Sequence, residues 1–294
     1  MNVVSLAVWT LEQHCYLVYA ALGACFLALS VYHRGPVVLR TGRERRQESG
    51  LGGEPAPRRD SDSDSDPDLT PALPLAPHVR YSPPRRSDEE LIQRSGEFHE
   101  LMARRRTVRA FSAEEIPREV LENVVRTAGT APSGAHTEPW TFVVVRDAST
   151  KAAIRDIVEE EEELNYSQRM SRQWVADLKP FATRHIKPYL TEAPALLLVF
   201  RQTHSFREDG KKKMHYYSEI SVAIAAGFIL AAIQYCGLVA LTSTPLNCNS
   251  RIRALLRRPP SERLELLLPV GRPHPEAMVP DLHRKPLQDI MVMI

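Results

Sequence analysis

The sequence divides into three stretches of different composition, and this division limits what the chain can fold into. Residues 15–32 form an 18-residue run without a formal charge. Residues 33–86 contain nine prolines and an alternating Asp/Ser run over 60–66, with almost no periodic aliphatic residues. A segment of that kind cannot bury enough apolar surface to offset its ordering entropy. Any large hydrophobic core must therefore come from residues 87–294, whose composition is that of a globular domain.

The uncharged run predicts a membrane-spanning helix. At 1.5 Å per residue it would extend about 27 Å, enough for a thin hydrocarbon core. No Lys or Arg precedes the run, while Arg34, Arg40 and Arg43 follow it closely, so the positive-inside rule puts the following chain in the cytoplasm. A cleaved signal peptide would need a basic segment that residues 1–14 lack. A buried soluble helix is the other alternative, but the residues after the run are too polar to cover it.

We therefore expect a short N-terminal segment (1–14), a transmembrane anchor (15–32) and a disordered linker (33–86) that tethers the anchor to a globular domain (87–294). The protein would be a single-pass protein of the plasma membrane or a vesicle membrane, with its globular domain in the cytoplasm. The Asp/Ser run resembles a substrate of acidophilic kinases, although a solvated spacer explains it more simply.

From Ser87 onward, helical and extended patterns alternate. Ser87 to Glu90 is a capping box, and the helix that it opens carries Leu91, Phe98, Leu101 and Met102 on one face. Pro117 opens a second helix that ends near Gly129. Further helices are expected near 150–173 and 215–236, and strands at 140–145, 195–200, 238–242 and 264–270. This alternation predicts an α/β domain of the α+β type, with a mixed sheet flanked by helices.

One helix of this domain, at 220–233, is apolar on nearly every side and could be mistaken for a second membrane span. Polar residues precede it and Gln234 follows, which favours a helix buried in a soluble domain. We expect it to lie in the core or in a dimer interface.

Composition and simple motifs exclude several classes of function. With 38 Lys+Arg against 36 Asp+Glu, the net charge of +2 gives no field that would attract nucleic acid. The four cysteines make neither a disulfide framework nor a CxxC pair, and no two of the ten histidines have the spacing of an HExxH zinc site. We expect no metal. The two commonest nucleotide fingerprints, GxGxxG and the P-loop, are also absent from the sequence.

Two segments carry residues suited to binding an anionic, planar ligand. Residues 104–109 contain four arginines, more than helix capping needs, and a guanidinium fork suits phosphate or a ring carbonyl. On their own they could equally form a surface patch. The loop 130–140 joins a helix to a strand with small residues, two prolines and one glycine. Small side chains let a flat ligand approach the backbone, and an ordinary connection would be shorter.

The residues of these two segments, Arg105-Arg106-Thr107-Val108-Arg109 and Ala131-Pro132-Ser133-Gly134 followed by Trp140, resemble the nitroreductase family of flavin enzymes. Thr127-Ala128-Gly129, the run of five glutamates and Thr244-Pro245-Leu246-Asn247-Cys248 resemble the branch of that family that acts on halotyrosines. The resemblance covers essentially all of 87–294. It implies a nitroreductase-like sheet in an intertwined homodimer, with FMN as cofactor.

The resemblance also implies which residues bind FMN. Residues Arg105, Arg106, Thr107, Val108 and Arg109 would hold its phosphate and the electron-rich side of its ring. Ser133 would contact the flavin from the loop, and Thr242, Ser243 and Thr244 would line the other side of the ring. Thr244 would donate a hydrogen bond to flavin N5, and Arg284 would complete the phosphate site from the partner subunit. The family usually has threonine at the position of Ser243, and a hydroxyl is kept.

The five glutamates at 159–163 are a special case. Most would form a solvated helix face, but continuing the apolar stripe of Ile154 and Val158 by four residues reaches Glu162 and then Tyr166. An acid on an inward face needs a cationic partner. The resemblance implies a zwitterion clamp, in which Glu162 and Tyr166 bind the substrate ammonium and Lys187 binds the carboxylate. The Ala135 backbone N–H would donate to the phenolate oxygen. Taken alone, Lys187 would be interpreted as a surface lysine.

The resemblance implies an enzyme that reductively removes iodide from mono- and diiodotyrosine, with electrons ultimately from NADPH or an NADPH-dependent reductase. It would serve iodide salvage. One alternative is a broad-specificity FMN reductase of nitro compounds or quinones, which would have no use for a zwitterion clamp. The other is a non-catalytic membrane flavoprotein scaffold. Bound FMN and turnover would separate the three.

Overall fold

The computed structural model describes residues 71, 73, 75–207 and 210–294, which belong to one compact unit spanning Pro57–Ile294. The expected anchor (15–32) and most of the expected linker (33–86) lie outside the described residues. The described end of the linker, residues 75–85, is exposed and has no helix or strand.

The centre of the fold is a four-stranded sheet in the order β1-β2-β6-β5. Its strands are β1 (Trp140–Val145), β2 (Ala195–Gln202), β5 (Val239–Ala240) and β6 (Glu262–Gly271). All three strand pairs are antiparallel, and among the described residues parallel pairing is limited to one bridge between Thr107 and Ala240. The sheet is thus more uniform than the mixed sheet expected from the sequence. A separate hairpin pairs β3 (His204–Phe206) with β4 (Lys212–Met214).

Strand β2 is apolar because it is covered on both faces. Leu196, Leu198 and Phe200 pack into one core, and the residues between them, such as Leu197 and Val199, pack into a second core on the opposite face. Successive side chains of a strand point to opposite faces, so both faces of a central strand must be apolar. Burying a Leu or Phe side chain fully contributes about 1.5–3 kcal/mol.

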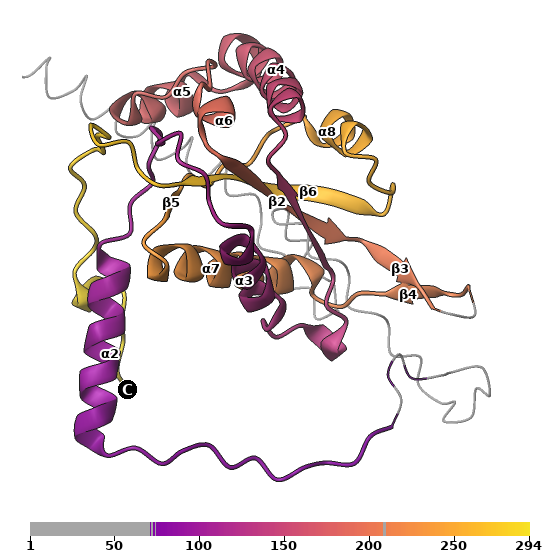
Figure 1. Cartoon of the computed structure of the whole chain (residues 1–294), viewed down its shortest axis with the longest axis vertical. Helices are drawn as coiled ribbons and strands as arrows, with labels where there is room; N and C mark the ends of the chain where they lie inside the picture. Colours follow the sequence, from indigo (N-terminus) through magenta and orange to yellow (C-terminus); the bar gives the residue numbers. More distant parts are fainter. Residues whose placement is uncertain (1–70, 72, 74, 208–209) are drawn as a thin grey trace, which may run out of the picture. The chain divides into compact units, whose positions relative to one another are not determined.

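Helices cover both faces of the sheet (Figure 1). The helices of the described residues are α2 (Asp88–Ala103), α3 (Arg118–Gly129), α4 (Ala148–Leu164), α5 (Arg172–Leu178), α6 (Tyr189–Glu192), α7 (Ser218–Tyr235) and α8 (Asn249–Leu255), of which α2 lies beside the sheet. The core on one face is completed by α4, α6 and α8, and the core on the other face by α3 and α7. Short helical turns lie at η1 (Gly134–His136), η2 (Asn165–Arg169), η3 (Lys179–Phe181) and η4 (Leu287–Asp289).

The helix starts follow the capping signals in the sequence. The Ser87 hydroxyl accepts a hydrogen bond from the Glu90 N–H at 3.2 Å, and α3 begins directly after Pro117. At the start of α4, the Asp147 carboxylate accepts hydrogen bonds from Ser149 and Thr150, which lower the pKa of Asp147 to about 2. These caps satisfy N–H groups that have no partner within the helix.

Helix α7 buries one apolar face and exposes another. Val222, Ala225 and Ile229 lie in the core, which confirms the expected buried helix, whereas Ile220 and Phe228 are exposed. Among the described residues, α7 is the one helix long and apolar enough to cross a membrane, and 39% of it is buried inside the domain. Helix α2 has no buried residue, and its apolar residues Leu91 and Phe98 are about half exposed.

Candidate active site

The segment after α2 is held against the sheet. Thr107 forms a parallel bridge with Ala240 of β5, and the Val108 N–H donates to the Ala240 carbonyl oxygen at 3.4 Å. The Val108 side chain is buried in the domain. These contacts fix the backbone from which the neighbouring arginines extend.

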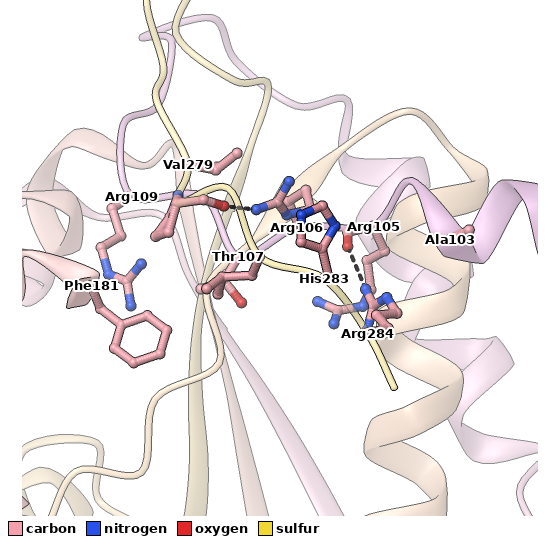
Figure 2. A pocket seen from close by; sticks show the side chains of 11 residues that line it. Ala103, Arg105, Arg106, Thr107, Arg109, Phe181, Val279, His283 and Arg284 are labelled. Carbon is pink, nitrogen blue, oxygen red and sulfur yellow. Dashed lines mark hydrogen bonds between the residues drawn. The ribbon is translucent and has the colours of Figure 1, made fainter. Parts of the chain in front are cut away.

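A cavity of about 470 Å³ lies beside this segment, and we refer to it as the arginine cavity (Figure 2). Its lining includes Arg105, Arg106, Thr107, Arg109, Phe181 and Arg284. The Arg284 side chain donates to the Arg105 carbonyl oxygen at 3.0 Å, and Arg106 donates to the Pro280 carbonyl oxygen. The chain's own C-terminal segment therefore closes the cavity. We expected Arg284 to come from a partner subunit, but the same chain supplies it.

The arginine cavity has positive charge without a protein counterion. Among the described residues, none of its four arginines forms an ion pair with a carboxylate. Burial and the neighbouring Arg284 both lower the pKa of Arg105, which means that its positive charge is stabilised less than in water. A bound phosphate would relieve this, because guanidinium forks bind phosphate through paired, charge-assisted hydrogen bonds.

A second cavity, of about 220 Å³, shares Arg109 with the first, and we refer to it as the clamp cavity. Its lining includes Arg109, Val158, Glu162, Tyr166, Lys187, Thr242, Ser243 and Thr244. The Nε atom of Arg109 is buried and has no hydrogen-bond partner. A buried donor without a partner costs about 1–3 kcal/mol, so a ligand that accepts from it would be favoured.

Three residues with hydroxyl groups, Thr242, Ser243 and Thr244, follow the short strand β5. This strand ends at Ala240 and not, as the sequence suggested, at Thr242. The pairing with β6 resumes at Ser243, whose N–H and C=O both bond to Leu267 at 3.1 and 2.9 Å. Thr242 and Thr244, on either side of that anchored residue, are exposed and line the clamp cavity. This is the strand-end position that the sequence predicted for them.

Glu162, Tyr166 and Lys187, which are expected to form a zwitterion clamp, come together in the clamp cavity. A Glu162 carboxylate oxygen lies 3.1 Å from Lys187 Nζ, which in turn lies 5.4 Å from the centre of the Tyr166 ring. The side chains of Glu162 and Lys187 are only 13% and 7% exposed. The stripe that runs from Val158 to Glu162 and Tyr166 thus faces inward, as the four-residue spacing predicted.

Lys187 is buried, and not on the surface, because a second glutamate of the run fixes its backbone. The Glu159 carboxylate accepts the Lys187 N–H at 2.6 Å and pairs with Arg155 at 2.7 Å. The Lys187 ammonium also donates to the Thr183 hydroxyl at 3.3 Å. Sequence reasoning missed Glu159 and Thr183. The i,i+4 spacing of Arg155 and Glu159 was a usable signal for the first, but nothing in the sequence pointed to the second.

Ser133 and Ala135 line neither cavity. They lie on the loop between α3 and β1, where the Ser133 hydroxyl accepts the Glu138 N–H at 3.0 Å and Ala135 has a φ of 50°. The loop packs tightly on the chain before α7, since a Cβ atom added to Gly134 would lie 2.5 Å from the Tyr216 carbonyl oxygen. One chain therefore does not bring this loop to the other predicted site residues.

Residues 102–272 match the sequence model described as the Nitroreductase family. The chain therefore belongs to the nitroreductase family. A BluB-like flavoprotein from Clostridium difficile, 20% identical with a TM-score of 0.53, has a similar fold; the alignment covers 67% of this chain and 98% of that one.

Within this family, the chain is most usefully compared with the iodotyrosine deiodinases. It is 58% identical to iodotyrosine deiodinase from Hydra vulgaris over 220 residues, 75% of this chain and 81% of the relative. It is also 58% identical to human iodotyrosine deiodinase 1 over 217 residues, 74% of this chain and 75% of the relative. A crystal structure of oxidised iodotyrosine deiodinase bound to FMN and 3-iodo-L-tyrosine aligns with a TM-score of 0.58 and 33% identity, over 67% of this chain and 97% of that one.

Proposed function

We propose that this chain is an FMN enzyme that reductively removes iodide from mono- and diiodotyrosine. The observation that carries the proposal is the pair of cavities joined at Arg109. One presents arginines without counterions, and the other presents a buried Glu162 and Lys187 beside an aromatic ring. An anionic cofactor suits the first, and a zwitterionic aromatic amino acid suits the second. The similar iodotyrosine deiodinase of known structure binds two ligands with this chemistry, FMN and 3-iodo-L-tyrosine.

The arginine cavity fits the FMN phosphate, and the unpartnered Nε of Arg109 fits an acceptor on the ring. We assign the side chains of Arg105, Arg106 and Arg284 to binding the phosphate. Thr107 and Val108 would contribute the backbone beside it. Arg109 would donate to the ring, with Thr242, Ser243 and Thr244 along its other edge, where Thr244 would donate to N5. When bound, FMN supplies the electrons that cleave the carbon–iodine bond; the protein's part is binding and orientation.

The zwitterion clamp would hold the amino-acid end of the substrate. The substrate ammonium would bind Glu162 and Tyr166, and its carboxylate would bind Lys187. In the chain as described, Glu162 and Lys187 neutralise each other. The substrate would therefore enter by exchanging that internal ion pair for two ion pairs of its own. Such charge-assisted hydrogen bonds are worth about 1.5–3 kcal/mol each.

Residues 159–187 would act as a lid over this end of the site. They consist of the end of α4 and the short elements η2, α5 and η3. Trp174 of α5 lines the clamp cavity and is about half exposed, so it has apolar surface left to cover a ligand. Closing the lid would exclude water from the clamp and strengthen its ion pairs.

A homodimer would complete the site. Ser133 and Ala135 line neither cavity in the single chain, yet family resemblance assigns Ser133 to the flavin and the Ala135 N–H to the phenolate oxygen. Exposed apolar residues on α2, α7 and the C-terminal segment, among them Phe98, Ile220 and Ile290, provide surface for a second copy. We infer that the loop 130–140 of one copy meets the cavities of the other.

Two further assignments rest on the sequence and on family membership. Electrons would come ultimately from NADPH, directly or through an NADPH-dependent reductase. Residues 15–32 would anchor the protein in the plasma membrane or a vesicle membrane, with residues 33–86 as linker and the catalytic domain (87–294) in the cytoplasm. Their support is the 18-residue uncharged run and the arginines that follow it.

The test uses the full-length chain purified in detergent. Bound flavin is released and identified, and iodide release from mono- and diiodotyrosine is measured with a chemical reductant. We expect FMN and stoichiometric iodide. Bound FMN with reduction of nitroaromatics but no iodide release would make the protein a broad-specificity reductase, and absence of flavin would favour a non-catalytic scaffold.

A further inference from the structure

A buried asparagine lies directly behind the zwitterion clamp. Asn165 is 1% exposed and begins η2, a single π-helical turn that continues α4. Its side-chain nitrogen donates to the Glu162 carboxylate at 3.3 Å. Its side-chain oxygen accepts from Asn247 Nδ2 and from Arg169, both at 3.2 Å.

These partners leave the Asn165 amide only one orientation. Two donors face its oxygen and a carboxylate faces its nitrogen. Turning the amide over would set its NH₂ group against the Asn247 and Arg169 donors and its oxygen against Glu162. Asn165 therefore always presents an N–H to one carboxylate oxygen of Glu162, while the other oxygen lies 3.1 Å from Lys187 Nζ.

Asn247 connects this arrangement to the loop that carries the flavin-side hydroxyls. It lies three residues after Thr244, and its φ of 63° is a left-handed conformation that asparagine and glycine adopt most readily. Its side chain crosses to Asn165, 82 residues away in the sequence. A single hydrogen-bonded path therefore runs from the Thr244 loop through Asn247 and Asn165 to Glu162.

We propose that Asn165 and Asn247 are positioning residues that hold the Glu162 carboxylate in place for the substrate ammonium and couple it to the Thr244 loop. Neither residue touches the substrate in this account, and both act through Glu162. The inference rests on the proposed function, because it assigns the ammonium to Glu162. It implies that a side chain on the flavin side of the site controls affinity for the amino-acid end of the substrate.

The first test replaces Asn247 with glycine in the full-length protein loaded with FMN. Glycine adopts the left-handed backbone without strain, and the substitution removes the donor together with the rest of the side chain. Affinities are measured by titration calorimetry for monoiodotyrosine and for ortho-iodophenol, which has the halogenated ring but no ammonium or carboxylate. We expect monoiodotyrosine affinity to fall about fivefold, the value of one typical hydrogen bond, with unchanged affinity for ortho-iodophenol and for FMN.

A double-mutant cycle then tests whether the two asparagines act together. Asn165→Ala should weaken monoiodotyrosine binding at least as much as Asn247→Gly, and the double variant should be no weaker than Asn165→Ala alone. Asn249→Ala is the matched control. Asn249 accepts the Leu264 N–H at 2.7 Å and has no contact with the clamp, so its loss should lower the melting temperature without a selective effect on monoiodotyrosine.

Several results would overturn the inference. Additive effects of the two substitutions would show that no shared path exists, and equal losses for ortho-iodophenol and monoiodotyrosine would indicate general damage. If Asn165→Ala does not fold, Asn247→Gly and Asn247→Asp serve as the test, since both remove the hydrogen bond donated to Asn165. Monoiodotyrosine affinity equal to that of wild type in both variants would reject the inference. Wild-type protein that binds no monoiodotyrosine would reject the proposed function itself, whereas tight wild-type binding with unaffected variants rejects only the role of the asparagines.

Discussion

Glu162 and Glu163 are adjacent in the sequence, yet only one of them lies in a cavity. Glu162 is largely buried and pairs with Lys187, whereas Glu163 is exposed and forms no ion pair among the described residues. The difference arises from one step of 100° around α4, which turns the second carboxylate from the apolar stripe to the solvent. At this scale, the function of a residue depends on its helix face and not on its chemical type.

Replacing Glu162 with glutamine should weaken monoiodotyrosine binding by roughly 10- to 150-fold, because a charge-assisted contact worth about 1.5–3 kcal/mol is lost. FMN content should not change, since the arginine cavity has no contact with that carboxylate. Calorimetry and flavin absorbance measure the two quantities. Glu163→Gln is the matched control and should behave as wild type. Unchanged affinity in Glu162→Gln would move the substrate site elsewhere.

Replacing Thr244 with alanine should slow iodide release roughly 2- to 10-fold while reduction of a nitroaromatic suffers less. The proposed hydrogen bond to flavin N5 would be lost, and a neutral hydrogen bond is worth about 0.5–1.5 kcal/mol. Turnover of the two substrates by one preparation gives the ratio. Thr244→Ser keeps the hydroxyl and should retain most of the activity. Equal rates in wild type and Thr244→Ala would remove Thr244 from the mechanism.

The thiol of Cys248 should resist alkylation at pH 8 in the native protein. Burial, together with the nearby Glu161 and Glu162, raises the pKa of Cys248 to about 12, so the reactive thiolate is scarce as well as inaccessible. Cys236, which is exposed, should be alkylated first. Peptide mapping after iodoacetamide treatment, with and without denaturant, checks this order. Rapid labelling of Cys248 in the folded protein would mean that the clamp region opens readily.

At the scale of elements, the sequence patterns predicted most of the framework but not its interruptions. The helix expected over 150–173 is divided into α4, the π-helical turn η2 and α5. The break was detectable in principle, because the Ser171 hydroxyl caps α5 by accepting the Trp174 N–H at 3.1 Å. The hairpin of β3 and β4 was not predicted, since its second strand begins with two lysines and lacks alternating apolar residues.

Without the family resemblance, which supplied Lys187 and the FMN residues, the candidate site could be predicted only where local spacing carries the information. Glu162 and Tyr166 follow from the helical period of their own segment. Burial of Lys187 does not, because its partners Glu159 and Glu162 lie 28 and 25 positions earlier, and only the fold brings them together. Nothing in the sequence indicated a role for Asn165 and Asn247 for the same reason, since their contact joins segments 82 residues apart.

The loop 130–140 allows a direct test of its packing. Gly134→Ala should destabilise the protein by about 1–3 kcal/mol, because the added Cβ would lie 2.5 Å from the Tyr216 carbonyl oxygen and one of the two backbones must move. Gly129→Ala is the control, since nothing lies within 4 Å of the added atom. Thermal unfolding of the two variants should differ by several degrees. Identical melting temperatures would show that the loop can shift to accommodate the added Cβ without a loss of stability.

At the scale of the molecule, the proposed homodimer accounts for apolar surface that the described residues leave exposed. Its two cores on the faces of the sheet are closed, whereas α2 buries none of its residues and the C-terminal segment exposes Met291 to Ile294. Exposed apolar surface of this extent is typical of a protein that associates with a partner. This exposed surface is available for the homodimer that we propose.

Removing residues 1–34 should therefore give a soluble, flavin-loaded dimer, because the cavities and both cores are built from residues after Ser87. Size-exclusion chromatography with light scattering gives the mass, and absorbance near the flavin bands gives the occupancy. A monomeric protein that has lost its flavin would show that the first 34 residues contribute to the fold or to the assembly.

The ion pair between Glu162 and Lys187 also limits which molecules the cavity can accept. An iodinated amine could pair with Glu162 only by leaving the buried Lys187 without a countercharge. An iodinated acid that paired with Lys187 would likewise leave Glu162 without one. An unpaired buried charge of this kind costs several kcal/mol. An amino acid carries both charges on one carbon and replaces the pair without that loss. If the clamp binds the substrate as we propose, the site should therefore disfavour iodinated ligands of unbalanced charge.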